Sequence, residues 1–228
     1  MPIHHSWFSD LAFGADSAGI DPFDYGAYRA ARDSVHEAIE RPGGTSLLIG
    51  PDGSGKSSLV HDLADSLATE PAVAILDGVR LNGRTLLAEV LAKFGYVVEP
   101  GSEDNLLDPI DAFASEAARV GKGPILVVDN ADRLYPSGMR ALNQLAELKL
   151  GGRPTLRLVL TGRDGLRKLV SSAQLGFIGE RLATECDLGP LTAGETRRYL
   201  HSRLAACGVQ PPDSVFPDNV CRGLHLSL

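Results

Sequence analysis

Gly50-Pro51-Asp52-Gly53-Ser54-Gly55-Lys56-Ser57 is the stretch that decides the fold of this 228-residue chain. The apolar run Leu47-Leu48-Ile49 precedes it, and a helical pattern begins at Ser58. A loop of this spacing between a buried strand and a helix is typical of the phosphate-binding loop, or P-loop. Its glycines let backbone N–H groups turn inward and form an anion site at the positive end of a helix. A plain glycine-rich turn with a solvated lysine is the alternative, and it fits the combined pattern poorly.

The P-loop predicts that the chain binds a nucleoside triphosphate together with Mg²⁺. Lys56 is expected to reach the β- and γ-phosphates, and the Ser57 hydroxyl to ligate Mg²⁺. No Asn-Lys-x-Asp sequence, which reads guanine, occurs in the chain, and this favours ATP over GTP. The predicted nucleotide-binding residues are Gly50, Pro51, Asp52, Gly53, Ser54, Gly55, Lys56, Ser57 and Ser58.

Composition is that of a globular protein with one sizeable core, since 43% of the residues are hydrophobic. The sequence has no apolar run long enough to cross a bilayer, and its first residues lack the basic and apolar regions of a secretory signal. A cytoplasmic protein without a transmembrane segment is therefore expected. Three widely spaced cysteines, Cys186, Cys207 and Cys221, do not suit a zinc site or a disulfide framework.

Charge is unevenly distributed along the chain, whose net charge is −7. Residues 1–150 carry 12 basic and 22 acidic side chains, a net charge of −10, whereas residues 151–208 carry 9 and 5, a net charge of +4. Regions of opposite sign could dock head to tail between copies of the chain, so a homo-oligomer is predicted. Two solvated surfaces of unlike sign are the alternative interpretation.

Five apolar strands alternate with helices, which predicts an α/β fold with a parallel sheet covered on both faces. Strands are expected at residues 46–49, 72–77, 125–129, 156–160 and 184–188. Helices are expected at residues 25–40, after the P-loop, and at 84–94, 110–120, 136–150, 165–170 and 193–206. The helix at residues 136–150 is predicted to end at Gly151-Gly152. The helix at residues 193–206 is predicted to begin with a capping box formed by Thr192 and Glu195.

Three segments organise the prediction. Residues 1–24 are expected to pack on the core through Trp7, Phe8, Phe13 and Phe23, and residues 25–190 to form the P-loop core. Residues 191–228 are expected to form a partial helical lid and tail, and the end from residue 208 onward, with several prolines and little periodicity, to be partly disordered.

Asp129 follows the apolar strand Ile125-Leu126-Val127-Val128. In a P-loop fold this position lies beside Mg²⁺, at the carboxyl ends of the strands. A strand that ends in aspartate is common, so a turn residue is the alternative. Downstream of a P-loop, after one βα unit, Asp129 is interpreted as the Walker B carboxylate, a metal-site residue together with Ser57.

The order of these parts resembles the AAA+ ATPases of the general secretion pathway (ExeA/GspA-like), and is also similar to transposition-type AAA ATPases. The resemblance runs from about Pro22 to Leu204 and implies a three-layer AAA+ sandwich with a five-stranded parallel sheet and an incomplete C-terminal lid. It is carried by Asp21-Pro22-Phe23, the P-loop with its strand, Leu126-Val127-Val128-Asp129, Leu156 to Gly162 with Leu166, Arg181, and the segment from Gly189-Pro190-Leu191-Thr192 to Leu204.

The resemblance also implies roles for single residues. Lys56 and Ser57 would hold the phosphates and Mg²⁺, and Asp129 would hold the water of the metal. Thr161 would be a polar sensor of the γ-phosphate, with a simple strand-end threonine as the alternative. Arg181 would be the finger that a neighbouring subunit inserts into the site, with a surface charge as the alternative.

Two departures from the family pattern affect these expectations. The position after Asp129 is Asn130, where the family has a glutamate that acts as base, and an amide cannot take a proton. Hydrolysis is therefore expected to be slow, unless Asp132 substitutes for the missing base. The sequence up to Leu228 contains no Gly-x-Pro-Arg sensor, transmembrane segment or peptidoglycan-binding part, all of which occur in the family.

These observations leave three hypotheses. The first is an oligomeric ATPase that hydrolyses ATP to ADP and phosphate and drives assembly of a secretion or envelope complex at the cytoplasmic face of the membrane. The second is a nucleotide-dependent switch with little hydrolysis, favoured by Asn130. The third is a DNA-associated ATPase, which the net charge of −7 disfavours because strong non-specific DNA binding needs a basic surface.

Overall fold

A computed structural model describes residues 23–68, 70, 72–97 and 105–226 of the chain. The chain divides into two compact units. Residues 26–189 form the larger unit, and the smaller one is described over residues 23–25 and 190–226. The predicted packing of Trp7, Phe8 and Phe13 on the core lies outside the described residues.

The larger unit contains the predicted five-stranded parallel sheet, in the order β2-β3-β6-β1-β7. Its strands are β1 (Thr45–Ile49), β2 (Val73–Asp77), β3 (Ile125–Asp129), β6 (Arg157–Gly162) and β7 (Leu182–Asp187). Because all five run in the same direction, their carboxyl ends meet at one edge, here called the carboxyl edge, and their amino ends meet at the opposite amino edge. The strand that leads into the P-loop, β1, lies between β6 and β7.

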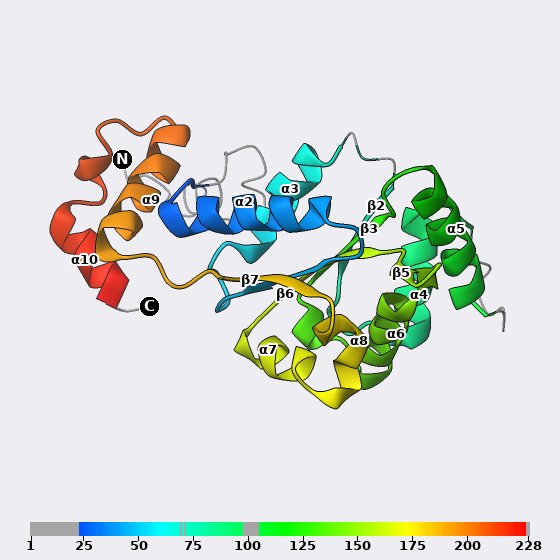
Figure 1. The fold of residues 1–228 in the computed structure, drawn as a ribbon. Coiled ribbons are helices and arrows are strands. Elements are labelled where there is room, and N and C mark those ends of the chain that lie inside the picture. Colours follow the sequence, from blue (N-terminus) through cyan, green and yellow to red (C-terminus); the bar gives the residue numbers. More distant parts are fainter. Residues whose placement is uncertain (1–22, 69, 71, 98–104, 227–228) are drawn as a thin grey trace. The chain divides into compact units, whose positions relative to one another are not determined.

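Helices cover both faces of this sheet (Figure 1). The helices α2 (Gly26–Glu40) and α3 (Lys56–Ser66) contact one face. The other face packs in a single core with α4 (Gly83–Lys93), α5 (Leu107–Val120), α6 (Pro136–Glu147), α7 (Asp164–Val170) and α8 (Gly176–Gly179). The predicted three-layer α/β fold is confirmed.

Side chains along β1 point alternately to the two faces of the sheet, so this strand packs against both helical layers. Leu47 and Ile49 belong to the core on the α4–α8 side. Leu48 is equally buried, and successive strand residues point to opposite faces, so it packs on the α2–α3 side. The helix predicted at residues 25–40 is confirmed as α2, and the residues that it buries are Tyr28, Ala31, Val35, Ala38 and Ile39.

The boundary predicted for residues 136–150 was wrong. The helix α6 ends at Glu147, and Lys149–Leu150 (β4) pairs with Arg153–Pro154 (β5) in a short antiparallel hairpin. Gly151 and Gly152 have φ values of 58° and 81°, and two consecutive residues with positive φ are what a tight hairpin turn requires. The two glycines therefore turn a hairpin and do not end a helix.

The smaller unit contains α9 (Ala193–Ala206), a single 3₁₀ turn at Pro212–Ser214 and α10 (Asp218–Leu226). The predicted capping box is confirmed, with Thr192 and Glu195 each bonded to the backbone N–H of the other. The expectation of a partly disordered end was wrong for the described part, because α10 packs against α9 and buries Cys221. In the part of the chain that the structure describes, we find no helix with the length and apolarity needed to span a membrane.

Candidate functional site

The P-loop connects β1 to α3 at the carboxyl edge. Gly53 and Gly55 have φ values of 78° and 93°, a conformation that side chains disfavour, and a Cβ atom at either would meet nothing within 4 Å. Gly50 is constrained differently, because a Cβ there would lie 2.4 Å from the Leu188 carbonyl oxygen. The loop thus turns its backbone toward open space while its first glycine packs closely against the end of β7.

Lys56 is the first residue of α3 and its side chain is buried. Its Nζ donates to the carbonyl oxygens of Gly50 and Pro51, at 2.8 Å and 2.7 Å. Burial lowers the pKa of the ammonium group, and nearby carboxylates, led by Asp52, oppose this shift. The cation is therefore held over the loop by weak neutral acceptors, which a phosphate oxygen could replace.

Ser57, Asp129 and Thr161 come together from three different elements. The Ser57 Oγ donates to Asp129 Oδ2 at 2.5 Å, and the Thr161 Oγ1 donates to Asp129 Oδ1. Ser57 is exposed, whereas Thr161 is fully buried in β6. A hydroxyl and a carboxylate beside a phosphate loop supply the hard oxygen ligands that Mg²⁺ prefers, so these residues fit the predicted ion. Ser58 lies in the first turn of α3 with its side chain exposed.

Asn130 follows Asp129 in the left-handed conformation, with φ at 51° and ψ at 39°. Asparagine tolerates this conformation better than most residues, which explains its fit at the turn. Its backbone N–H donates to Asp129 Oδ1 at 3.0 Å and to Thr161 Oγ1 at 3.2 Å. Its side-chain Nδ2 donates to Asp77 Oδ1 at 3.1 Å, which joins the carboxyl ends of β3 and β2.

Two ion pairs border this group of residues. Arg133 Nη2 lies 2.9 Å from Asp52 Oδ2, which links the turn after β3 to the P-loop. Arg163 Nε lies 2.8 Å from Asp132 Oδ2, and this bond raises the pKa of the arginine. Because the Asp132 side chain is only 6% exposed and already paired, this geometry argues against the predicted use of Asp132 as a substitute base.

Arg181 does not lie with the other predicted site residues. It is at the amino edge, where its guanidinium donates to the carbonyl oxygens of Gly43 (2.7 Å), Ala146 and Leu156. Burial lowers its pKa to about 10. A guanidinium bonded to three backbone carbonyls of its own subunit cannot also extend into a neighbour, so the structure argues against the predicted arginine finger.

Sequence reasoning missed two residues of the site. Asp77 ends an apolar strand just as Asp129 does, and the two are paired in register on adjacent strands, so a usable signal was present. Arg133 gave no signal, because an arginine four residues after a strand has no pattern that separates it from a surface charge. Its contact with Asp52 depends on how the turn after β3 folds back over the P-loop.

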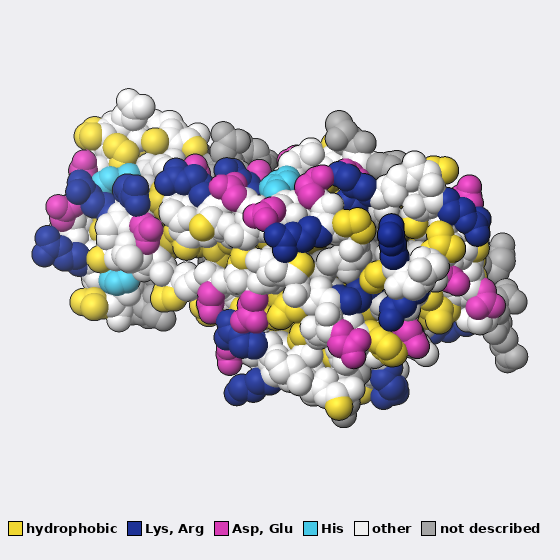
Figure 2. All heavy atoms as spheres, viewed as in Figure 1, with side chains coloured by type: hydrophobic (Ala, Val, Ile, Leu, Met, Phe, Trp, Pro, Cys, Tyr) yellow, Lys and Arg dark blue, Asp and Glu magenta, His cyan; other side chains and the backbone are white. Residues whose placement is uncertain are grey.

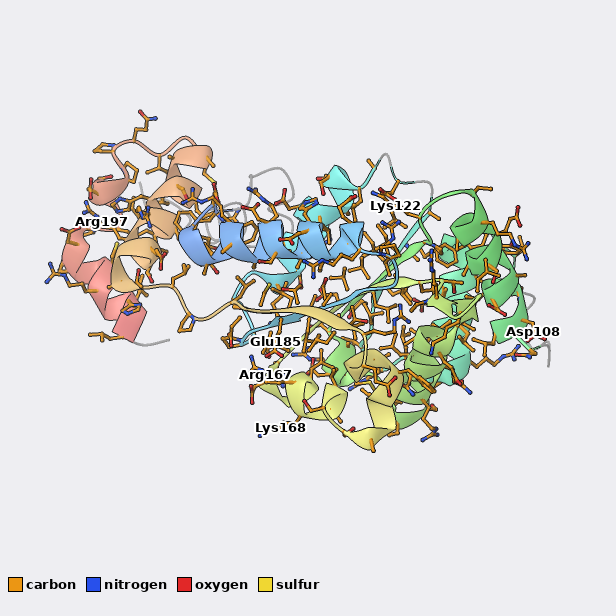
Figure 3. All side chains as sticks on the ribbon, in the orientation of Figure 1. Asp108, Lys122, Arg167, Lys168, Glu185 and Arg197 are labelled. Carbon is orange, nitrogen blue, oxygen red and sulfur yellow. The ribbon has the colours of Figure 1, made fainter. Side chains whose placement is uncertain are left out.

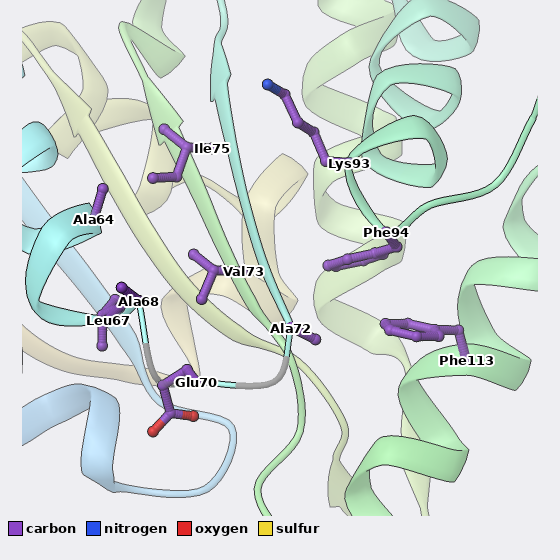
Figure 4. A pocket seen from close by; sticks show the side chains of 10 residues that line it. All are labelled: Ala64, Leu67, Ala68, Glu70, Ala72, Val73, Ile75, Lys93, Phe94 and Phe113. Carbon is purple, nitrogen blue, oxygen red and sulfur yellow. The ribbon is translucent and has the colours of Figure 1, made fainter.

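A hollow of about 420 Å³ lies elsewhere, beside the amino-terminal half of β2 (Figure 4). The rings of Phe94 and Phe113 stack at its wall, 4.7 Å apart between centroids. Its other lining residues come from the end of α3, the entry to β2 and the end of α4: Ala64, Leu67, Ala68, Glu70, Ala72, Val73, Ile75 and Lys93. None of the predicted site residues lines it, so it is separate from the P-loop.

Charged side chains on the surface of the larger unit are mixed in sign. Over α2, basic and acidic groups are interspersed (Figure 2), and Arg41 pairs there with Glu37 at 2.7 Å. On the opposite layer, Arg167 of α7 lies beside Glu185 of β7 (Figure 3) and also bonds Asp187 at 3.0 Å. Such pairs contribute little to stability because solvent screens them.

Comparisons with known proteins agree with this geometry. General secretion pathway protein A of Aeromonas hydrophila is 28% identical over 192 residues, a match that covers 84% of this chain and 35% of the relative. The chain thus spans about a third of the length of that curated relative.

Among solved structures, Cdc6p from Pyrobaculum aerophilum aligns with a TM-score of 0.65 at 16% identity, over 86% of this chain and 53% of the other. The ADP form of the Aeropyrum pernix ORC2 protein aligns with a TM-score of 0.63 at 15% identity, over 93% and 64%. At these identities the likeness concerns the fold alone.

A family model described as an AAA domain matches residues 39–170, which include the P-loop, β3 with Asp129, and β6 with Thr161. This match spans more than half of the chain. Together with the resemblance to general secretion pathway protein A, it shows that the chain belongs to the AAA domain family of P-loop ATPases.

Proposed function

We propose that this chain binds ATP with Mg²⁺ and hydrolyses it to ADP and phosphate. The observation that carries the proposal is the hydrogen bond between Ser57 and Asp129, 72 positions apart in sequence, directly beside an open glycine-rich loop. A serine at the start of a helix and an aspartate at the end of a strand meet in this way where both face one metal ion.

The residues of the site would act by binding and orientation. The backbone N–H groups of residues 50–57 would bind the phosphates, and Lys56 would exchange its two carbonyl acceptors for phosphate oxygens. Ser57 and Asp129 would hold Mg²⁺, which, when bound, neutralises charge on the phosphate oxygens. Thr161 would fix the orientation of the Asp129 carboxylate, to which its Oγ1 donates, and the same Oγ1 accepts from the Asn130 N–H.

The process served is proposed from the relative named above. ATP turnover would drive assembly of a secretion or envelope complex, with several copies of the chain acting together at the cytoplasmic face of the membrane, where ATP is available. The unequal charge of residues 1–150 and 151–208 supports contact between copies. Nucleic acid is not proposed as a partner.

A second candidate function is a nucleotide-dependent switch that binds ATP and recruits a partner with little turnover. Asn130 favours it, because a positioned general base is typically worth about 10²–10⁴-fold in rate and an amide supplies none.

Mg²⁺-dependent ATP hydrolysis, measured against protein concentration, tests both candidates. An assembling ATPase predicts a rate per subunit that rises with concentration and is lost in Lys56→Ala. A switch predicts ATP binding without turnover at every concentration. Failure to bind ATP at all would contradict both.

A further inference from the structure

Asn130 leaves the site without a carboxylate where the attacking water would be activated, and a carboxylate lies directly against it. The Asn130 Nδ2 donates to Asp77 Oδ1 at 3.1 Å, and the Val79 N–H donates to the same oxygen at 3.2 Å. Asp77 is exposed and ends β2, in register with Asp129 at the end of β3. The amide and this carboxylate therefore form one group at the carboxyl edge.

The other carboxylates of the edge are engaged elsewhere. Both oxygens of Asp129 accept bonds, from Ser57 and from Thr161. Asp132 is paired with Arg163 in a nearly buried position, and Asp52 is paired with Arg133. Asp77 differs, because it is exposed and no cationic side chain of the described residues pairs with it; its Oδ1 accepts from neutral donors only, and no donor bonds its Oδ2.

The orientation of the Asn130 amide follows from its partner. A carboxylate only accepts hydrogen bonds, so the NH₂ group of the amide must face Asp77. The amide oxygen then points away from Asp77, and no donor from the described part of the chain bonds it. The pair thus presents two free acceptors, one neutral and one charged, while the bond between them fixes their relative position.

We propose that Asp77 is the general base of ATP hydrolysis in this chain, with Asn130 as the positioning residue. The inference rests on the proposed function and adds a residue to the same site. Asp77 and Asn130 together perform the role of the glutamate that follows the Walker B aspartate in the family. The Asn130 Oδ1 accepts one hydrogen of the water and orients it, and Asp77 Oδ2 accepts the other.

The reaction balances with no further reactant. The water oxygen forms a bond to the γ-phosphorus as the bond from that phosphorus to the β–γ bridging oxygen breaks, and the bridging oxygen leaves with the electron pair as part of ADP. One proton of the water passes to Asp77 and from there to solvent. The products are ADP, inorganic phosphate and a proton.

The test compares turnover and Mg·ATP binding in the unaltered 228-residue chain, Asp77→Asn, Asp77→Asn/Asn130→Asp and Asp108→Asn. Asp77→Asn keeps the size of the side chain and the acceptor for Val79, and it should lower turnover about 10²-fold or more while binding ATP as before. The double variant exchanges carboxylate and amide, and aspartate also tolerates the left-handed conformation at position 130. It should regain at least tenfold over Asp77→Asn.

Asp108→Asn is the matched control, since it removes an exposed carboxylate of α5 (Figure 3) and should change nothing. Turnover of Asp77→Asn within threefold of the unaltered chain would overturn the proposal. So would loss of ATP binding in that variant, because Asp77 would then serve binding and not proton transfer. An unaltered chain that binds ATP without turnover overturns the role of Asp77 and leaves nucleotide binding intact, whereas a chain that does not bind ATP refutes the proposed function itself.

Discussion

The two edges of the central sheet both concentrate polar side chains, but they use them in opposite ways. At the carboxyl edge, Lys56 donates to two carbonyl oxygens of the P-loop, and the exposed Ser57 donates to Asp129. The side chain of Asn130 donates to the exposed Asp77. At the amino edge, Arg157 and Arg181 donate mainly to backbone carbonyl oxygens that come from several different segments of the fold. One edge can rearrange around a ligand, and the other connects parts of the fold.

Arg157 is the clearest example at the amino edge, because its residue is only 1% exposed. It donates to the carbonyl oxygens of Gly123 (2.8 Å) and Ile39 (3.1 Å), and it pairs with Glu70 at 2.9 Å. It thereby joins the end of α2, the entry to β3 and the segment before β2. A cationic side chain at the edge of a sheet therefore does not by itself indicate a phosphate site. Its hydrogen-bond partners show whether it has a structural role.

The largest effect on activity is expected from Lys56→Ala. Removing a cation that faces developing charge typically costs about 10²–10³-fold in rate, so turnover should fall by at least that amount. Because only the two bonds that Lys56 donates to carbonyl oxygens of the P-loop are lost, the folded state should survive, as circular dichroism would show. Lys93→Ala, which removes an exposed lysine at the hollow of Figure 4, should leave turnover unchanged. Equal turnover in the two variants would contradict the assignment of the nucleotide site to the carboxyl edge.

The largest effect on stability is expected from Arg157→Met. Losing one partner of a buried ion pair typically costs about 3–5 kcal/mol, and here two buried carbonyls also lose their donor. Urea unfolding would measure the change in the free energy of unfolding. The matched variant is Arg167→Met, whose guanidinium pairs with carboxylates on the surface, where solvent screens the pairs, so its loss should be much smaller. A similar loss in both variants would contradict the assigned difference.

An intermediate effect is expected from Arg181→Met. Its three carbonyl acceptors would be left unsatisfied, which should lower the free energy of unfolding by about 2–3 kcal/mol. Turnover per folded subunit should stay within threefold of the unaltered chain at every protein concentration. If turnover instead collapses in assembled protein while stability hardly changes, Arg181 acts as a finger after all.

The smallest effect is expected from Asp52→Asn. The substitution removes a negative charge at the P-loop and releases Arg133, whose exposed pair with Asp52 is worth less than about 1 kcal/mol. Both changes favour an anionic ligand, so ATP should bind about two- to threefold more tightly by titration calorimetry. Weaker binding would mean that the pair supports the loop.

Much of the fold could be predicted from the sequence, because the P-loop indicates a strand before it and a helix after it, and the apolar runs indicate the other strands of the same sheet. Asp129 was predicted as a site residue because it ends a strand that must reach the same edge as the P-loop, whereas Thr161 was predicted from the family resemblance. The contact of Asn130 with Asp77 was not predicted, since it depends on the left-handed turn at position 130 and on the order of neighbouring strands.

Arg181 illustrates the opposite difficulty. The position of Arg181 in the chain is compatible with an arginine finger. The burial of its guanidinium and its bonds to carbonyl oxygens argue for a structural role, and neither can be read from the amino-acid sequence. Gly151 and Gly152 were similarly ambiguous, because glycine ends helices and turns hairpins equally well. In both cases the local residue type was compatible with two structures, and contacts from distant parts of the chain selected one.

The most direct test of the central claim is equilibrium binding of Mg·ATP to three proteins: the unaltered chain, Lys56→Ala and Arg181→Met. If the carboxyl edge is the nucleotide site and the amino edge is structural, the unaltered chain and folded Arg181→Met bind one ATP with similar affinity, and Lys56→Ala loses binding by at least tenfold. Binding that survives Lys56→Ala, or no binding by the unaltered chain, would contradict the account.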